Sequence, residues 1–259
     1  MTVFGADYVS YYDLFYADKD YGAEAAFTVD VIKRHRPAAA SLLELGCGSA
    51  RHAVEFARSG FSVAGIDRSA DMIARGRERI VRLSAGLRDR IELIEGDATN
   101  YQADTVHDAV ISLFHVMSYQ TTNDALRRTF RTARSATAPG GLFVFDFWYG
   151  PAVLTDRPEV RVRRVANADV DIVRIAEPDH HVNRNIVDVK YTFIAIDKKT
   201  GLSEERTEVH PMRYLFLPEI ELLAAGAGFE IVESGEWLSG RELGARCWSG
   251  YVAARARAD

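Results

Sequence analysis

Short apolar runs alternate with amphipathic stretches from residue 41 to residue 149. Patterns of helical period fill residues 50–58, 69–83 and 122–136, and the apolar runs between them are too short for buried helices. This alternation is typical of a parallel sheet with helices on both faces. The predicted strands are SLLELGC (41–47), SVAGID (62–67), IELIEGD (91–97), DAVISLF (108–114) and GLFVFDFWY (141–149).

The pattern changes after residue 149. Residues 185–197 alternate as a strand does, with Val187, Val189, Tyr191 and Phe193 on one face, and the DKKTG that follows predicts a hairpin turn. Residues 151–215 therefore predict an antiparallel insert after the fifth strand, without a helix. A short helix at LPEIELLAAGAGF and two strands, FEIVESGEW and CWSGYVAARA, close the chain.

Three parts follow from these patterns. We expect an aromatic-rich, helical leader over residues 1–36, lying above the site. The core comprises residues 37–150 and 216–259. The insert, residues 151–215, is predicted to bind substrate or to contact a second subunit, because an exposed antiparallel layer could pair two copies into a homodimer. The leader concentrates its aromatic residues at Tyr8, Tyr11, Tyr12, Phe15, Tyr16 and Tyr21.

Composition narrows the function. The chain has 259 residues, 47% of them hydrophobic, which suffices for a sizeable core. A net charge of −5, with both signs mixed along the chain, argues against nucleic acid and against a membrane surface. Cys47 and Cys247 fit no metal or redox motif, so we expect no metal site and a reducing, cytoplasmic location. A small-molecule substrate is the interpretation that remains.

A glycine turn links the first strand to the first helix. In ELGCGSA, Gly46 and Gly48 allow close approach of a ligand to the backbone, and Asp67 ends the second strand where a ribose-binding acid belongs. A nicotinamide dinucleotide requires a further glycine, where this chain has Arg51. Glu44, just before the turn, suits a cationic ligand better than a pyrophosphate. At the end of the third strand, Asp97 and Ala98 are placed to bracket a purine ring.

Glu44, the GCG turn, Asp67 and Asp97 at this spacing resemble the class I S-adenosylmethionine-dependent methyltransferases. The resemblance implies an α/β, Rossmann-like sheet of seven strands that ends in an antiparallel hairpin. It also implies S-adenosyl-L-methionine as cofactor and S-adenosyl-L-homocysteine as product. Its cofactor-binding residues here would be Glu44, Gly46, Cys47 and Gly48 around the methionine part, Asp67 on the ribose, and Arg68, Met72, Asp97 and Ala98 around the adenine.

The run FHVMSYQ, residues 114–120, ends the fourth strand beside the transferable methyl group in this fold. We expect Leu113 and Phe114 to pack near the cofactor, and His115 and Tyr119 to face the methyl acceptor. The structural alternatives are that His115 is a solvated loop residue and that Phe114 belongs to the core.

A closer resemblance concerns the acceptor. YDLFY, KDYGAEA, the insert and the late SGR are similar to nucleotide-linked amino-sugar N-methyltransferases. The resemblance implies that Tyr21 lies against the cofactor, that Tyr16 and Asp146 belong to the catalytic pocket, and that Trp148 and Arg241 bind substrate. Members often have histidine where this chain has Tyr119, so a pocket shaped by Tyr16, Tyr119 and Asp146 is the mechanism we expect.

Other functions remain open from the sequence. An O-methyltransferase on a sugar or other small alcohol would share the cofactor site. A nicotinamide oxidoreductase and a protein that binds the cofactor without catalysis come from different classes. In the insert, Arg161, Arg163, Arg164 and Arg174 are typical of a solvated strand face, with a diphosphate contact as the alternative. His210, Met212 and Tyr214 share one strand face and are interpreted as core or as a dimer contact.

Overall fold

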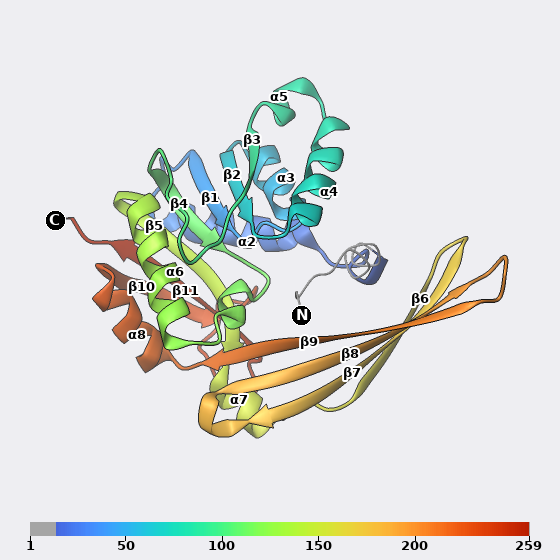
Figure 1. Ribbon diagram of the computed structural model, residues 1–259. Helices are drawn as coiled ribbons and strands as arrows, with labels where there is room; N and C mark the ends of the chain where they lie inside the picture. Colours follow the sequence, from blue (N-terminus) through green and yellow to red (C-terminus); the bar gives the residue numbers. More distant parts are fainter. Residues whose placement is uncertain (1–13, 259) are drawn as a thin grey trace.

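A computed structural model describes residues 14–258 (Figure 1). Its centre is a parallel sheet in the order β3-β2-β1-β4-β5. This arrangement confirms the sheet that the alternating pattern predicts. The strands are β1 (Ser41–Leu45), β2 (Ser62–Asp67), β3 (Ile91–Glu95), β4 (His107–Ser112) and β5 (Thr137–Tyr149).

An antiparallel pair completes this sheet. β11 (Ser249–Ala256) runs antiparallel beside β5, and β10 (Phe229–Glu236) pairs with β11. The order β3-β2-β1-β4-β5-β11-β10 therefore gives the predicted seven strands, with the closing hairpin at one edge.

Helices cover both faces of this sheet. Three of them begin at side-chain caps, in which Asp20, Ser69 and Thr122 accept a hydrogen bond from a backbone N–H of the first turn. Ser69 is the first residue of the helical stretch 69–83 that the sequence predicts. The helices are α2 (Tyr21–His35), α3 (Arg51–Arg58), α4 (Ala70–Val81), α5 (Ala85–Arg88), α6 (Asn123–Ala136), α7 (Gly150–Thr155) and α8 (Leu217–Gly226).

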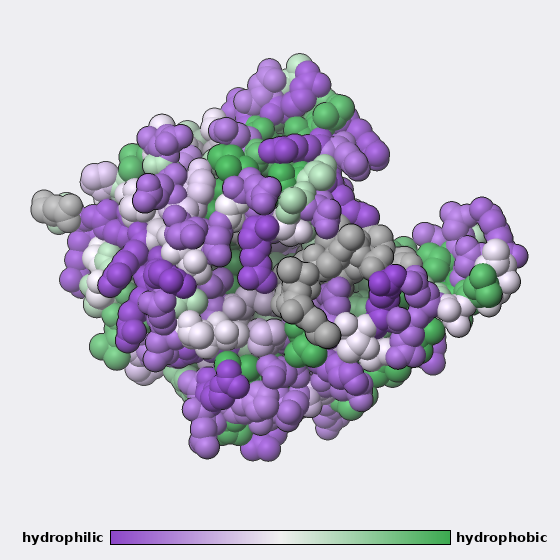
Figure 2. Space-filling view, viewed as in Figure 1, coloured by the Kyte–Doolittle hydropathy of each residue, from purple (hydrophilic) through white to green (hydrophobic). Residues whose placement is uncertain are grey.

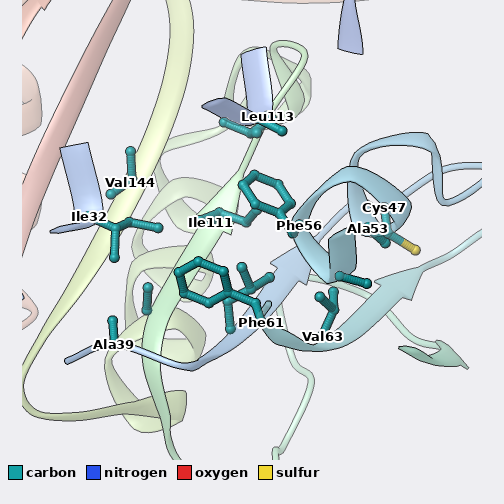
Figure 3. Packing of buried hydrophobic residues seen from close by; sticks show 14 of the residues in the cluster. Ile32, Ala39, Cys47, Ala53, Phe56, Phe61, Val63, Ile111, Leu113 and Val144 are labelled. Atoms are coloured by element: carbon teal, nitrogen blue, oxygen red, sulfur yellow. The ribbon is translucent and has the colours of Figure 1, made fainter. Parts of the chain in front are cut away.

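The core lies in two layers. On one face α2, α3 and α4 pack on the sheet, and on the other α6 and α8 do so (Figure 1). Figure 3 shows the first layer, where Phe56 and Phe61 pack against Ile111 of β4. The same cluster extends to Cys47 and Leu113, at the ends of β1 and β4. The core thus supports the glycine turn and the β4 loop from below.

The insert forms an antiparallel layer that projects from the core as a long arm (Figure 1). It joins the main sheet where β5 extends beyond β4, through the parallel pairs Trp148↔Tyr214 and Tyr149↔Leu215. Because of this junction, one end of the arm lies beside the carboxyl ends of the parallel strands. Its strands are β6 (Arg161–Ala166), β7 (Val170–His181), β8 (Ile186–Asp197) and β9 (Ser203–Leu215).

The chain differs from the sequence prediction at both ends of β5. The insert was predicted to lack a helix, yet it opens with α7, because Pro151 occupies the first turn, where its missing N–H costs nothing. β5 already begins at Thr137, which pairs with His107, and the register against β4 shifts before pairing resumes at Leu142. The predicted turn between β8 and β9 is present, and the Asp197 carboxylate accepts hydrogen bonds from the N–H groups of Lys199 and Thr200.

Hydrophilic residues dominate the face shown in Figure 2, and the apolar residues form small separate patches. Within residues 14–258, no helix has both the length and the apolar character needed to cross a bilayer. The part of the leader before residue 14, including Tyr8, Tyr11 and Tyr12, lies outside the described residues.

Candidate active site

A cavity of about 720 Å³ lies between the carboxyl ends of the parallel strands and the near end of the insert. Most of the residues singled out from the sequence line it: Tyr16, Gly46, Gly48, Asp67, Arg68, Met72, Asp97, Ala98, Leu113, Phe114, His115, Tyr119 and Trp148. Five others do not line it, namely Tyr21, Glu44, Cys47, Asp146 and Arg241.

The glycine turn forms one wall. Gly46 has φ +79° and Gly48 has φ +53°, and a Cβ on Gly46 would lie 2.6 Å from Cγ2 of Val116. Asp67 fixes the turn from β2, since its carboxylate accepts hydrogen bonds from the N–H groups of Gly48 and Ser69, each at 2.9 Å. Burial raises the pKa of Asp67, although these two hydrogen bonds oppose the rise. The turn and Asp67 therefore present backbone and carboxylate oxygen to the same part of the cavity.

Glu44 lies beneath the turn rather than in its wall. It is 1% exposed, and Oε2 has no hydrogen-bond partner among the described residues. Burial, and then the charge of Asp67, raise its pKa well above the ordinary value. Its other oxygen, Oε1, lies 3.7 Å from Nδ1 of His52. A cation placed against the turn would satisfy this buried carboxyl group and favour its ionised form.

A chain of polar side chains connects the leader helix to Glu44. Nε2 of His52 lies 2.7 Å from Glu24 of α2, and Lys19 forms an ion pair with the same carboxylate. Burial raises the pKa of Glu24, but the hydrogen bond and charge of His52, together with Lys19, outweigh this and lower it to about 2. Tyr21 packs edge-on against the His52 ring, with centroids 4.8 Å apart. Tyr21 thus holds α2 against the cofactor side of the core.

The residues before α2 lie over the β4 loop. The Tyr16 ring meets the Phe114 ring edge-on at 5.0 Å, and the Lys19 ammonium is 4.3 Å from the centre of the Phe114 ring. On its other side, Tyr16 accepts a 3.4 Å hydrogen bond from Arg174 of the insert. The described end of the leader therefore spans the cavity between the core and the arm.

The β4 loop has a strained backbone. Phe114 and His115 have φ values of +62° and +63°, a conformation that costs a bulky residue about 1–2 kcal/mol. Asp146 of β5 holds it in place, because Oδ1 accepts the N–H of His115 at 2.9 Å and Oδ2 lies 2.9 Å from Nδ1 of the same residue. Asp146 is 1% exposed, which explains why it does not line the cavity. Its structural effect is to aim Phe114 and His115 into the cavity.

Tyr119 brings the insert into the site. It follows the loop on a short 3₁₀ turn (Val116–Tyr119), and its hydroxyl lies 2.9 Å from Nδ1 of His210 on β9. Burial, and then the neighbouring Tyr191, raise the pKa of Tyr119 well above the ordinary value. Further insert residues line the same part of the cavity: Glu159, Arg161, Arg174, Ala176, Pro178, Val189, Tyr191 and Met212.

The sequence interpretation missed most of these insert residues. Arg161 and Arg174 line the cavity, whereas the sequence favours a solvated strand face for them and leaves a diphosphate contact as the alternative. His210 and Met212 are buried, as the core interpretation predicts, and Met212 also lines the cavity. Val189 and Tyr191 were placed correctly on one strand face, but the pairing that brings His210 opposite Val189 was not available from the pattern. Alternation defines the two faces of a strand without giving its partner or register.

Comparisons with known proteins agree with this geometry. The profile of a methyltransferase domain matches residues 42–141, which span the glycine turn and the strand-end acids. The chain is an S-adenosylmethionine-dependent methyltransferase. A dTDP-3-amino-3,4,6-trideoxy-α-D-glucopyranose N,N-dimethyltransferase of Streptomyces venezuelae is 28% identical over 93% of this methyltransferase and 98% of its own length. A dTDP-3-amino-3,6-dideoxy-α-D-glucopyranose N,N-dimethyltransferase of Streptomyces fradiae is 27% identical over 90% of this methyltransferase and 87% of its own length.

Solved structures place the fold in the same class. The crystal structure of Streptomyces venezuelae DesVI superimposes with a TM-score of 0.79, at 25% identity over 98% of the methyltransferase and 100% of that chain. The sugar N-methyltransferase KedS8 of a Streptoalloteichus species gives a TM-score of 0.80 at 23% identity, over 100% of this methyltransferase and 97% of the KedS8 chain. The core and the insert are therefore both parts of a known fold.

The residues at the strand ends fit the cofactor. Among the described residues the buried Oε2 of Glu44 has no hydrogen-bond partner, and it lies beside a turn that exposes backbone, which suits the positively charged methionine part of S-adenosylmethionine. Asp67 offers carboxylate oxygens for ribose hydroxyls, and Asp97 and Ala98 line the next stretch of the wall. When bound, the cofactor supplies an electrophilic methyl group on sulfur.

Arg241 lies away from this methyltransferase site. Its side chain is 77% exposed, and the guanidinium donates hydrogen bonds to Glu236 at 2.6 and 2.9 Å. β10 ends at Glu236, and the tight turn that follows folds the chain back so that the carboxylate meets Arg241. The SGR motif is thus held at the surface beside β10, in contrast to the expected contact with substrate.

Proposed function

We propose that this methyltransferase transfers methyl groups to the amino group of a nucleotide-linked deoxyamino sugar. The observation that carries the acceptor class is the continuity of the cavity. It runs from the cofactor residues at the strand ends to a second part lined by Tyr119, Tyr191, Arg161 and Arg174. The dTDP-amino-sugar N,N-dimethyltransferases that resemble the chain over its length, including the insert, support this assignment.

The two parts of the cavity suit the two parts of such a substrate. Tyr16, Tyr119 and Tyr191 offer aromatic faces and hydroxyl groups to a deoxy sugar, which is partly apolar. Arg161 and Arg174 offer guanidinium groups, which bind phosphate oxygens well. Arg174 is already oriented, since it lies against the rings of Phe15, Tyr16 and Tyr191. We assign these arginines to the diphosphate, which is the alternative that the sequence left open for the arginines of the insert.

Catalysis in this site rests on positioning. Attack of a neutral amine on the methyl group is an in-line displacement, and alignment of the reactants in a closed site supplies about 7–11 kcal/mol. Phe114 and His115 are held in one orientation by Asp146, and Trp148 packs beside His115 with ring centroids 6.3 Å apart. Tyr16 closes the site from the leader. These side chains exclude water from the acceptor nitrogen and limit its approach to one direction.

In this proposal the leader, the core and the insert each have a separate role. The core (37–150 and 216–259) holds the cofactor, the described part of the leader (residues 14–36) covers it, and the insert (151–215) holds the acceptor. Pairing of two subunits through the insert stays a prediction.

Two acceptors that differ in one functional group, an amine or a hydroxyl, test the proposal. Steady-state rates are measured with a nucleotide-linked amino sugar and with the same sugar bearing a hydroxyl group instead of the amine. Methylation of the amine alone supports the assignment. Equal methylation of the alcohol would replace it with an O-methyltransferase, and transfer to neither would leave the acceptor class refuted.

Variants of two arginines locate the nucleotide. Arg174→Ala removes a guanidinium from the cavity, and loss of a charged hydrogen bond of about 1.5–3 kcal/mol raises the acceptor KM roughly 10- to 150-fold. Arg163→Ala is the matched control, because Arg163 lies on β6 outside the cavity and pairs with Asp18 at 3.5 Å. Equal effects of the two substitutions would contradict a diphosphate contact at Arg174.

A further inference from the structure

His210 lies directly behind Tyr119 and has no place in the positioning mechanism. It is 1% exposed, and its Nδ1 is 2.9 Å from the Tyr119 hydroxyl. The Tyr191 ring of β8 packs edge-on against it, with centroids 4.9 Å apart. A titratable side chain is thus buried one hydrogen bond away from the cavity that receives the acceptor.

The contact continues from His210 toward solvent. Its Nε2 is 3.2 Å from the carboxylate of Glu208, two residues earlier on the same strand, and the Glu208 side chain is 17% exposed. A carboxylate at Nε2 favours the tautomer that carries its proton there, which leaves Nδ1 free of a proton and able to accept one. The line Tyr119–His210–Glu208 therefore runs from the cavity through the insert to the surface.

The acceptor amine must lose a proton before it can attack the methyl group, and this line of hydrogen bonds can carry that proton away. An alkyl amine is protonated at neutral pH, with a pKa near 10, and an ammonium group cannot attack the methyl carbon. The Tyr119 hydroxyl stays protonated and offers no phenolate as a base, because burial and the neighbouring Tyr191 and Tyr16 raise its pKa well above the ordinary value against the opposing charge of Arg68. A neutral hydroxyl can still accept one proton while it donates its own.

We propose that His210 removes the proton from the bound acceptor ammonium through the Tyr119 hydroxyl, and that Glu208 stabilises the imidazolium that forms. This proposal rests on the amine acceptor argued above. An N–H bond of the ammonium breaks and an O–H bond forms on Tyr119. The original Tyr119 proton moves to Nδ1 of His210, so one positive charge passes from the amine to the imidazole. The proton then leaves to water at Glu208. His210 acts through Tyr119 and is a positioning and relay residue.

Other charged and titratable groups lie beside this line of hydrogen bonds. Tyr191 faces His210 from β8 and has a pKa raised to about 12 by burial and by Tyr16, so it stays neutral during turnover. Arg174 lies against the far side of the Tyr191 ring. Among the groups named here, Glu208 is the carboxylate within hydrogen-bonding distance of His210.

His210→Asn separates the relay from a packing role. The asparagine oxygen takes the place of Nδ1 and can accept the Tyr119 hydrogen bond, but it cannot take up a proton. At pH 7 we expect kcat/KM for the acceptor to fall about 100-fold, within the range of general base catalysis. The shift in melting temperature on adding S-adenosylhomocysteine stays as in the native protein. A rate within twofold of native would show that His210 only orients Tyr119 and would overturn the proposal.

The pH profile gives a second readout that packing does not change. Without the relay only the neutral amine in solution is productive, so kcat/KM of His210→Asn rises roughly tenfold per pH unit from pH 6 to pH 9. The native profile is flatter, because the ammonium form binds and is deprotonated in the site. Parallel profiles for the two proteins would contradict the relay.

A double-substitution cycle completes the test. Tyr119→Phe breaks the same line, so the double variant with His210→Asn should be no slower than the slower single variant. If the loss of rate in the double variant equals the product of the two single losses, Tyr119 and His210 act independently, and the proposal is overturned. Glu208→Gln, at a partly exposed position, covers the case in which the buried variants fold poorly. Glu208→Gln should lose activity several-fold, and its kcat/KM should depend on pH as that of His210→Asn does. A pH profile of kcat/KM like that of the native protein would refute the relay. Failure of the native protein to methylate any amine would instead refute the proposed function.

Discussion

The two glycines of the cofactor turn give a matched pair of substitutions. Gly46 and Gly48 both have positive φ, so alanine at either position suffers left-handed strain of about 1–2 kcal/mol. They differ in surroundings. A Cβ on Gly46 would meet Val116 at 2.6 and 2.7 Å, whereas a Cβ on Gly48 meets nothing within 4 Å. Val116 is β-branched and stiff, so it cannot rotate out of the way without moving the β4 loop.

The difference between the two alanine variants isolates that contact. Strain and the stiffening of the unfolded chain are similar for both, and they cancel in the comparison. The remaining term is overpacking against Val116, which costs about 1–3 kcal/mol. At about 2–4 °C per kcal/mol for a chain near this size, Gly46→Ala should melt about 2–12 °C below Gly48→Ala.

Thermal unfolding with and without S-adenosylhomocysteine measures both effects. Without ligand, Gly46→Ala is expected to have the lower melting temperature. With ligand, Gly48→Ala should show a reduced stabilisation although its own fold is less affected, because the new methyl group points into the open cavity. Equal melting temperatures of the two variants would refute the packing argument, and full ligand stabilisation of Gly48→Ala would refute the placement of the cofactor.

Three further predictions concern the buried carboxylate of Glu24, the anchor of the β4 loop at Asp146, and the exposed Arg241. The lowering of the pKa of Glu24 from 4.5 to about 2 stabilises the fold by about 3 kcal/mol above pH 4.5, and this is lost as the pH falls toward 2. Urea midpoints of Glu24→Gln should therefore depend less on pH between 6 and 3 than those of the native protein. Asp146→Asn should lower kcat about 10-fold or more with little change in cofactor affinity, as steady-state kinetics would show, because His115 loses its anchor. Arg241→Ala should leave the acceptor KM within twofold, since its partner is Glu236.

The strands of the parallel sheet followed from the sequence because hydrophobic periodicity and turn chemistry are local. Alternating apolar runs gave β1 to β5, and Gly46, Gly48, Asp67 and Asp97 were placed correctly at their carboxyl ends. Parallel strands bring their carboxyl ends to one edge, so their positions along the chain were enough to group these residues in one wall.

The acceptor part of the cavity could not be predicted in the same way. It depends on the register between β8 and β9 and on the junction of β9 with β5, which are long-range pairings. A charged or buried residue on a strand has the same local pattern whether it faces a ligand or a neighbour. Arg174 was therefore interpreted as a surface residue, and Arg241 was assigned to the substrate by its motif alone.

The most direct test of the central claim follows the methyl group itself. The protein is incubated with S-adenosylmethionine that carries a ¹³C-labelled methyl group and with a nucleotide-linked deoxyamino sugar, and the product is examined by NMR. The account predicts that the label appears on the sugar nitrogen. Label on a sugar oxygen, or label that stays on the cofactor with the native protein folded and binding S-adenosylhomocysteine, would contradict it.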